Sequence, residues 1–139
     1  WAVDEEADFV ITHDGARPLL TADLIKNIIE ELQNYKAVIA GVPVKDTIKV
    51  VDHKQMAVKT PDRSKLVAVQ TPQAFAKDLI LRAYQQAQAE GFTGTDSASL
   101  VERLGQSVKV VQGAPENLKI TTPEDLELAK KILEMRQCE

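Results

Sequence analysis

The chain of 139 residues is poor in cysteine, and its one cysteine is Cys138. A single cysteine leaves no internal disulfide and no cysteine-based metal site. No apolar run approaches the ~20 residues that a bilayer-spanning helix needs. The first residues also lack the basic and apolar segments of a signal peptide. These absences favour a protein of the reducing cytoplasm that does not enter a membrane.

An excess of positive charge is also missing, because 17 Lys and Arg residues stand against 21 Asp and Glu residues, for a net charge of −4. That balance argues against a surface that binds duplex nucleic acid by neutralising its phosphates. The histidines, His13 and His53, lack neighbours at metal-ligand spacing. The chain contains no Walker loop, Gly-x-Gly-x-x-Gly, Gly-x-Ser-x-Gly or Cys-x-x-Cys motif. Any glycine loop that cradles a phosphate must therefore come from outside this stretch.

What is present fits one soluble α/β domain, with 44% hydrophobic and 27% charged residues. Apolar periodicity predicts strands at 9–12, 37–42, 66–70 and 108–111, a short extended piece at 117–120, and helices over 22–34, 77–89, 96–104 and from 123 onward. Thr21 and Thr95 are the expected N-caps, and Gly91 and Gly105 the expected helix stops. Alternating strands and helices predict a layered α/β structure.

Two lysine-rich segments, 47–51 and 56–60, flank a polar turn and predict a hairpin. So small a hairpin can bury little of itself, so we expect a β-arm at about 43–65 that projects or packs on a partner. We expect Thr71-Pro72-Gln73 to leave the sheet after the strand that follows the arm.

Polar residues gather where predicted strands end and helices begin. These residues are Asp14, Arg17, Asp46, Thr47, Arg63, Thr71, Thr95, Asp96 and Lys119. Ligands of open α/β sheets bind outside the carboxyl ends of strands, which places Asp14 and Arg17 at such a rim. Simple structural roles stay open, because Asp14 and Arg17 could form a loop ion pair and Thr95 could only cap a helix. Lys119 is harder to explain in this way, since it lies in a short apolar piece and could face the same rim.

Six segments stand in a recognisable order: HDGARP at 13–18, VPVKDTIK at 42–49, TPDR at 60–63, QTPQAF at 70–75, GTD at 94–96 and NLKITTPEDL at 117–126. Together they resemble the 2-C-methyl-D-erythritol 4-phosphate cytidylyltransferase family over nearly the whole chain. The resemblance implies a Rossmann-like, GT-A-like nucleotidyltransferase sheet with a projecting β-arm. It also implies a homodimer in which each arm reaches over the partner's site.

The implied reaction transfers the cytidylyl group of CTP to 2-C-methyl-D-erythritol 4-phosphate, with Mg²⁺ required. It yields 4-diphosphocytidyl-2-C-methyl-D-erythritol and pyrophosphate in the non-mevalonate isoprenoid pathway. By resemblance, Arg63 and Lys119 are the catalytic residues that clamp the sugar phosphate. Arginine offers phosphate a bidentate fork and lysine a point charge. Arg63 would serve the other subunit's site.

The remaining site residues follow from the same resemblance. Thr47, Thr71 and Thr95 match hydrogen-bonding positions around the substrate, and Thr47 would also act across the dimer. Asp14 and Arg17 match residues that contact the erythritol hydroxyls, and Asp14 would lie close to the metal.

One part of the family pattern is missing, namely the N-terminal glycine-rich loop that binds the CTP phosphates. We therefore expect residues 1–139 to be the C-terminal part of a single cytidylyltransferase domain, nearly inactive alone. Two alternatives stay open: a ribitol-5-phosphate cytidylyltransferase, and a non-catalytic dimerisation or ligand-sensing module. Ala16 and the context of Thr71-Pro72-Gln73 favour the erythritol enzyme. The presence of both Arg63 and Lys119 favours catalysis, because a scaffold has no need of a phosphate clamp.

Overall fold

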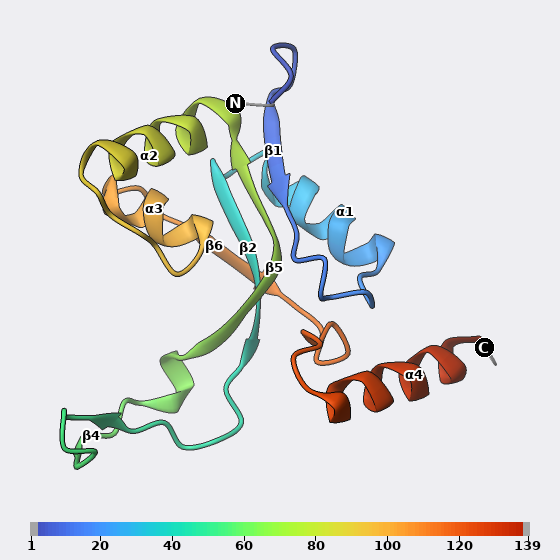
Figure 1. Cartoon of the computed structure of the whole chain (residues 1–139). Helices are drawn as coiled ribbons and strands as arrows, with labels where there is room; N and C mark the ends of the chain where they lie inside the picture. Colours follow the sequence, from blue (N-terminus) through green and yellow to red (C-terminus); the bar gives the residue numbers. More distant parts are fainter. Residues whose placement is uncertain (1–2, 138–139) are drawn as a thin grey trace.

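A four-stranded sheet forms the centre of the molecule, in the order β1-β5-β2-β6 (Figure 1). The strands are β1 (Phe9–Thr12), β2 (Ala37–Pro43), β5 (Val67–Ala76) and β6 (Lys109–Gln112). Strand β5 is antiparallel to both β1 and β2, whereas β2 and β6 are parallel. Strands β1, β2 and β6 therefore point the same way, and their carboxyl ends lie at one edge of the sheet.

The computed structural model describes residues 3–137, so Trp1 and Cys138 lie outside it. Helix α1 (Ala22–Glu31) covers one face of the sheet, and helices α2 (Lys77–Ala89) and α3 (Ser97–Arg103) cover the other. No helix in the described range is long and apolar enough to cross a bilayer.

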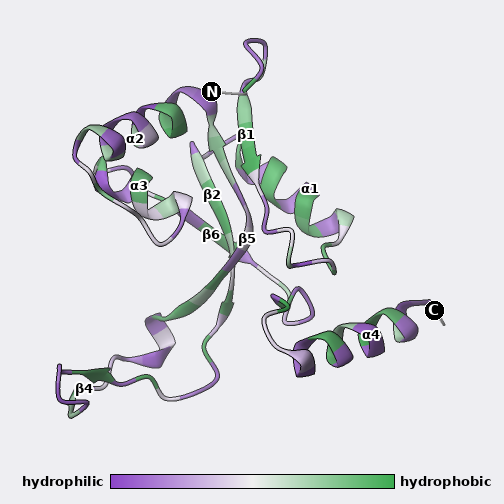
Figure 2. Cartoon of the chain, viewed as in Figure 1, coloured by the Kyte–Doolittle hydropathy of each residue, from purple (hydrophilic) through white to green (hydrophobic). Residues whose placement is uncertain are grey.

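The core alternates along β2, because successive strand residues point to opposite faces. Val38 and Ala40 pack with Ile28 of α1, whereas Ala37 and Ile39 pack against the α2 and α3 side. Figure 2 shows β2 coloured mainly as hydrophobic, whereas the helices carry both hydrophobic and hydrophilic residues. A strand covered on both faces was expected from its continuous apolar run.

Most helix ends follow the predicted signals. Thr21 caps α1, accepting a hydrogen bond from the Leu24 amide, and Gly91 and Gly105 adopt positive φ angles of 63° and 73° after their helices. Helix α1 ends three residues before the predicted Asn34, because residues 33–34 close the last turn with bonds to carbonyls only three residues back.

The prediction that Thr95 caps α3 is wrong. Asp96 is the cap, and its Oδ1 accepts the Ser99 amide at 2.9 Å. Both residue types cap helices well. Contacts from elsewhere in the fold therefore decide between them.

The prediction that Thr71-Pro72-Gln73 leaves the sheet is also wrong, because β5 continues to Ala76. Ile39 pairs with Gln73 and Ala40 pairs with Gln70, so Thr71 and Pro72 form a bulge opposite β2. The bulge removes Pro72, which has no N–H to donate, from the hydrogen-bonded ladder. The Thr71–Pro72 peptide bond is cis.

The hairpin is present, and it is shorter than predicted. Its strands are β3 (Val50–Val51) and β4 (Ala57–Lys59), followed by a 3-10 turn, η1 (Arg63–Lys65). Figure 1 shows this arm projecting away from the sheet. Apolar side chains on it are open to solvent, since Met56 is 64% and Val58 61% exposed.

Helix α4 (Pro123–Gln137) begins with reciprocal capping bonds between Thr122 and Asp125. The predicted apolar face is largely uncovered, because only Ala129 of the described helix is buried. The preceding segment, predicted to be extended, forms no strand and is tied to the Asp14–Arg17 loop by a bond from the Ile120 amide to the Ala16 carbonyl.

Candidate functional site

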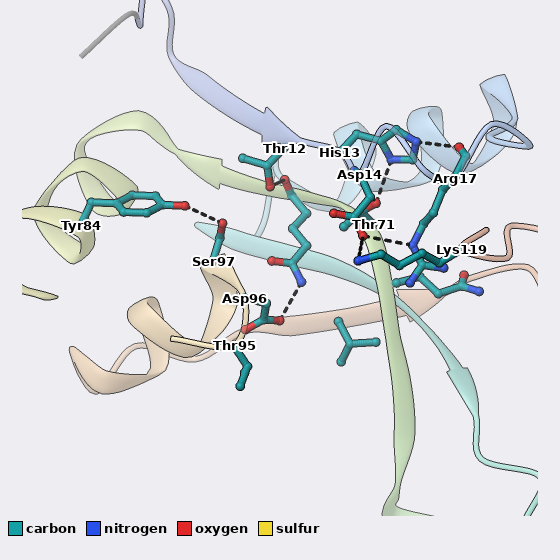
Figure 3. Close-up of a pocket in the computed structure, with 13 residues that line it drawn as sticks. Thr12, His13, Asp14, Arg17, Thr71, Tyr84, Thr95, Asp96, Ser97 and Lys119 are labelled. Carbon is teal, nitrogen blue, oxygen red and sulfur yellow. Dashed lines mark hydrogen bonds and ion pairs between the residues drawn. The ribbon is translucent and has the colours of Figure 1, made fainter. Parts of the chain in front are cut away.

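A pocket of about 510 Å³ opens where β1 ends, beside the bulge of β5 and the start of α3 (Figure 3). It is lined by Asp14, Arg17, Thr71, Thr95 and Lys119, all predicted site residues. Figure 3 shows Thr95 on the α3 side of the pocket and Lys119 on the opposite side. The sequence thus predicted much of the lining of this pocket.

Two cations converge on one carboxylate at the pocket wall. Lys119 Nζ lies 3.0 Å and Arg17 Nε 3.7 Å from Asp14 Oδ2. The side chains of Lys119 and Asp14 are 48% and 37% exposed. A pair this exposed contributes at most about 1 kcal/mol to stability. An incoming anion can therefore take over Lys119 at small energetic cost.

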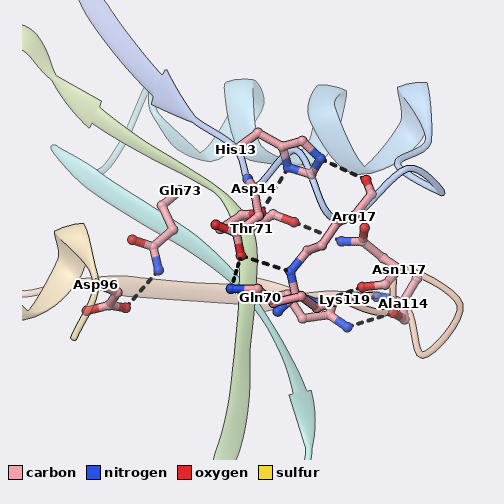
Figure 4. Close-up of polar contacts among 10 residues, drawn as sticks. All are labelled: His13, Asp14, Arg17, Gln70, Thr71, Gln73, Asp96, Ala114, Asn117 and Lys119. Atoms are coloured by element: carbon pink, nitrogen blue, oxygen red, sulfur yellow. Dashed lines mark hydrogen bonds and ion pairs between the residues drawn. The ribbon is translucent and has the colours of Figure 1, made fainter. Parts of the chain in front are cut away.

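Asn117, which the sequence analysis did not single out as a site residue, ties three segments together behind this cluster (Figure 4). It is 1% exposed, its Nδ2 donates to the Thr71 carbonyl at 2.8 Å, and its own carbonyl accepts from Arg17 Nη1 at 2.8 Å. Buried polar groups are nearly always hydrogen-bonded. Arg17 Nε and Asn117 Oδ1 are nevertheless buried without a hydrogen-bond partner among the described residues.

His13 is a second residue that the sequence analysis missed, having considered it only as a metal ligand. Its Nε2 lies 3.0 Å from the Arg17 carbonyl and its Nδ1 2.9 Å from Thr71 Oγ1. The Asp14 amide donates to the same Oγ1 at 3.0 Å. The Thr71 hydroxyl is therefore held from two sides by the loop that carries Asp14.

On the other wall, Gln73 joins β5 to the start of α3. It is 2% exposed, its Nε2 donates to Asp96 Oδ2 at 2.8 Å, and its Oε1 accepts the Ala98 amide. This bond, together with the Ser99 cap, fixes Asp96 and leaves the neighbouring Thr95 exposed at the pocket.

The segment between β6 and Lys119 begins with a close contact between the backbones of Gly113 and Gly41. The Gly113 amide donates to the Gly41 carbonyl at 2.8 Å, and the Gln70 side chain bonds both polar groups of the Ala114 backbone. A Cβ at Gly113 would lie 2.4 Å from Gln70 Oε1. A larger residue here would displace the Gln70 side chain that holds the Ala114 backbone.

The predicted arm residues do not lie in this pocket. Thr47 and Arg63 are exposed, and Arg63 Nη1 donates to the Lys45 carbonyl at 2.6 Å. Neither side chain lines the pocket of its own chain. Their role across a dimer stays a prediction from the resemblance.

The described residues form no metal cluster from protein side chains alone. Mg²⁺ in proteins is held by carboxylates and substrate phosphates. Within residues 3–137 no group of three His, Cys, Asp or Glu side chains could hold a metal, and the Asp14 carboxylate faces two cations. The assignment of Asp14 as a metal ligand stays a prediction from the resemblance.

The charged pocket lies beyond the carboxyl end of β1, at the edge of the sheet where open α/β proteins bind their ligands. Several solved structures similar to this chain are of one kind of nucleotidyltransferase. The chain belongs to the 2-C-methyl-D-erythritol 4-phosphate cytidylyltransferase family, whose sequence profile matches residues 1–135.

Individual relatives agree with this. The 2-C-methyl-D-erythritol 4-phosphate cytidylyltransferase of Symbiobacterium thermophilum is 52% identical over 139 residues, which is 99% of this chain and 59% of that protein. That of Caldanaerobacter subterraneus is 53% identical over 131 residues, 94% of this chain and 58% of that protein. The chain thus spans about three fifths of the length of these relatives.

Solved structures confirm the predicted fold class. The 4-diphosphocytidyl-2C-methyl-D-erythritol synthase of Anaerococcus prevotii superposes with a TM-score of 0.89 at 40% identity, covering 96% of this chain and 62% of that one. The Francisella tularensis cytidylyltransferase gives a TM-score of 0.85 at 32% identity, covering 94% and 62%. The chain is therefore a partial domain of the nucleotidyltransferase fold.

Proposed function

We propose that the protein containing this chain transfers the cytidylyl group of CTP to 2-C-methyl-D-erythritol 4-phosphate. In this proposal the chain supplies the part of the site that holds the polyol phosphate. The supporting observation is the convergence of Lys119 and Arg17 on Asp14 at the pocket. Such a cluster offers cations to a phosphate and a carboxylate to hydroxyl groups.

The substrate phosphate would enter by exchanging partners with Asp14. A phosphate oxygen that takes up Lys119 releases the Asp14 carboxylate, which is then free to accept hydrogen bonds from the polyol hydroxyls. Arg17, anchored to the Asn117 carbonyl, stays in place beside it. One phosphorylated polyol would thus satisfy both halves of the ion pair.

In the reaction an oxygen of the polyol phosphate attacks the α-phosphorus of CTP. A new phosphoanhydride bond forms, the bond between the α-phosphorus and its bridging oxygen breaks, and pyrophosphate leaves with the electron pair. Two anions must approach each other, so positioning and charge stabilisation supply most of the rate enhancement. Lys119 offsets the charge of the attacking phosphate. Mg²⁺ bound with the CTP phosphates would neutralise further charge, and Asp14 is the residue of this chain that would lie close to it.

Arg63 and Thr47 would reach the same substrate from a second copy of the chain. The apolar residues of the arm are exposed, and an isolated two-stranded hairpin is at best marginally stable in water. A homodimer in which each arm covers the partner's pocket would bury these residues and bring Arg63 to the phosphate opposite Lys119.

Pyrophosphate release tests the proposal. The chain would be completed with the segment of the Symbiobacterium thermophilum relative that it does not match, and supplied with CTP and 2-C-methyl-D-erythritol 4-phosphate. We expect turnover by the completed polypeptide, little by the 139-residue chain alone, and much less with ribitol 5-phosphate as the acceptor. A preference for ribitol 5-phosphate, or no turnover with either acceptor, would overturn the proposal.

A further inference from the structure

The contacts of His13 determine which hydrogen-bonding role is left to Thr71. A carbonyl oxygen only accepts, so His13 Nε2, 3.0 Å from the Arg17 carbonyl, must carry a proton. In a neutral imidazole the other nitrogen is then an acceptor. The Thr71 hydroxyl therefore donates its one proton to His13 Nδ1 across 2.9 Å.

The Asp14 amide occupies one of the two lone pairs of the same oxygen, at 3.0 Å. A hydroxyl has one proton and two lone pairs. With the proton given to His13 and one lone pair given to Asp14, a single lone pair is left. Thr71 is half-buried at the pocket wall, where that lone pair is available to a ligand.

We propose that His13 is a positioning residue that makes Thr71 a hydrogen-bond acceptor, so that Thr71 binds a hydroxyl group of the substrate and not a phosphate oxygen. The inference rests on the proposed function for the identity of the substrate, a phosphorylated polyol. The proposal divides the pocket into hydrogen-bond donors and hydrogen-bond acceptors. The cations Lys119 and Arg17 meet the phosphate, while Asp14 and Thr71 offer acceptors to hydroxyl protons.

The arrangement also explains why the loop carries an imidazole at this position. His13 spans from the Arg17 carbonyl to the Thr71 hydroxyl, so it fixes the loop on both sides of Asp14. A side chain with only one polar atom could fill one of these contacts. An imidazole donates from one nitrogen and accepts at the other at a fixed separation.

Nuclear magnetic resonance of the 139-residue chain tests the polarity directly, whether or not the chain is active. With only two histidines, a His53→Gln variant assigns the signals. In mildly alkaline buffer, where exposed imidazoles are neutral, we expect His13 as the Nε2–H tautomer. We also expect its Nδ1 resonance to move in Thr71→Val and to stay in Thr71→Ser. An Nδ1–H tautomer, a doubly protonated ring or an unmoved Nδ1 would overturn the inference.

Kinetics of the completed polypeptide test the consequence for binding. We expect His13→Phe and Thr71→Val each to raise KM for the polyol phosphate about 10-fold. The KM of the double variant should be no higher than that of the single variant with the larger KM. KM for CTP should stay within about twofold of the parent value. Losses that multiply to about 100-fold, or an equal rise in KM for CTP, would contradict the inference.

Monofluorinated substrate analogues test the choice of partner, because fluorine cannot donate a hydrogen bond. We expect one position at which fluorine costs the parent about 10-fold in kcat/KM and costs Thr71→Val nothing further. If no fluorinated position gives this result, Thr71 does not accept a hydrogen bond from a substrate hydroxyl. If the completed parent releases no pyrophosphate, the proposed function fails, and the resonance experiment still decides the role of His13.

Discussion

Lys119 Nζ and Asp14 Oδ2 lie 3.0 Å apart, joining the segment before α4 to the loop after β1. Both side chains stay partly open to solvent, so the contact adds little to stability. Under the proposed function, the pair holds a cation at the pocket until the substrate phosphate displaces the carboxylate.

Replacement of Lys119 by methionine should therefore separate stability from activity. We expect the free energy of unfolding of Lys119→Met to change by less than about 1 kcal/mol. Activity of the completed polypeptide should fall at least about 100-fold, because a charge aimed at the reacting phosphate is lost. Chemical denaturation and pyrophosphate release measure the two quantities.

Lys130→Met is the matched control, since Lys130 also forms an exposed ion pair, with Glu127, outside the pocket. It should leave both quantities nearly unchanged. If both variants lose only a little activity, Lys119 is not a catalytic residue.

A mixing experiment tests whether the arm acts across a dimer. Arg63→Ala and Lys119→Ala should each be inactive as homodimers of the completed polypeptide. After unfolding and refolding in equal amounts, half of the dimers carry one subunit of each kind. One of the two sites in each mixed dimer then combines an intact Lys119 with an intact Arg63. Activity should return to about a quarter of the parent value. No recovery, with dimers confirmed by light scattering, would place Arg63 in the site of its own chain.

The close approach at Gly113 predicts a large effect from one methyl group. Gly113→Ala puts a Cβ 2.4 Å from Gln70 Oε1 and 3.3 Å from the Gly41 backbone. We expect a loss of about 1–3 kcal/mol in the free energy of unfolding, as for other overpacked sites. Gly15→Ala is the control, because nothing lies within 4 Å of its Cβ position. It should be neutral or slightly stabilising. Equal melting temperatures for the two variants would contradict the packing argument.

Acid should loosen the start of α4 through Asp125. Hydrogen bonds from the Thr121 backbone amide and hydroxyl and from the Thr122 amide lower the pKa of the Asp125 carboxyl below its usual 3.8. A lowered folded-state pKa means that this stabilisation is present above the unfolded pKa and is lost as pH falls through the folded value. The protection factors of the amides of residues 121–126, which compare each exchange rate with its intrinsic rate at the same pH, should therefore fall below about pH 4.

Asp125→Asn keeps an acceptor oxygen and removes the titration. Protection factors in this variant should be lower than in the parent at neutral pH, and should show no acid-dependent step of this origin. The same acid-dependent fall in both proteins would assign it to another group.

The sequence predicted best what depends on neighbours in the chain. Helix α2 has the predicted bounds, because its apolar spacing and Gly91 are local signals. Thr95 and Asp96 are both good caps, and the choice between them depends on Gln73 from β5, which no local pattern contains. The same holds for Thr71-Pro72, since a bulge opposite β2 shows only when the two strands are paired.

The candidate site divides in the same way. Asp14, Arg17 and Lys119 were singled out because they lie in short motifs at the ends of predicted elements, and these motifs are visible in the sequence. His13 and Asn117 were missed because each acts through partners distant in the sequence, Thr71 above all. A buried asparagine beside a site lysine is the signal that could have identified Asn117.

Strand β5 has a consequence for the assembly as a whole. It is a continuous strand from the base of the arm, through the bulge at Thr71, to the first residue of α2. If each arm covers the partner's pocket, the two pockets of a dimer are connected by extended backbone on both sides. Strands bend and stretch far less than loops. The length of the two β5 strands would therefore determine the distance between the two bound substrates.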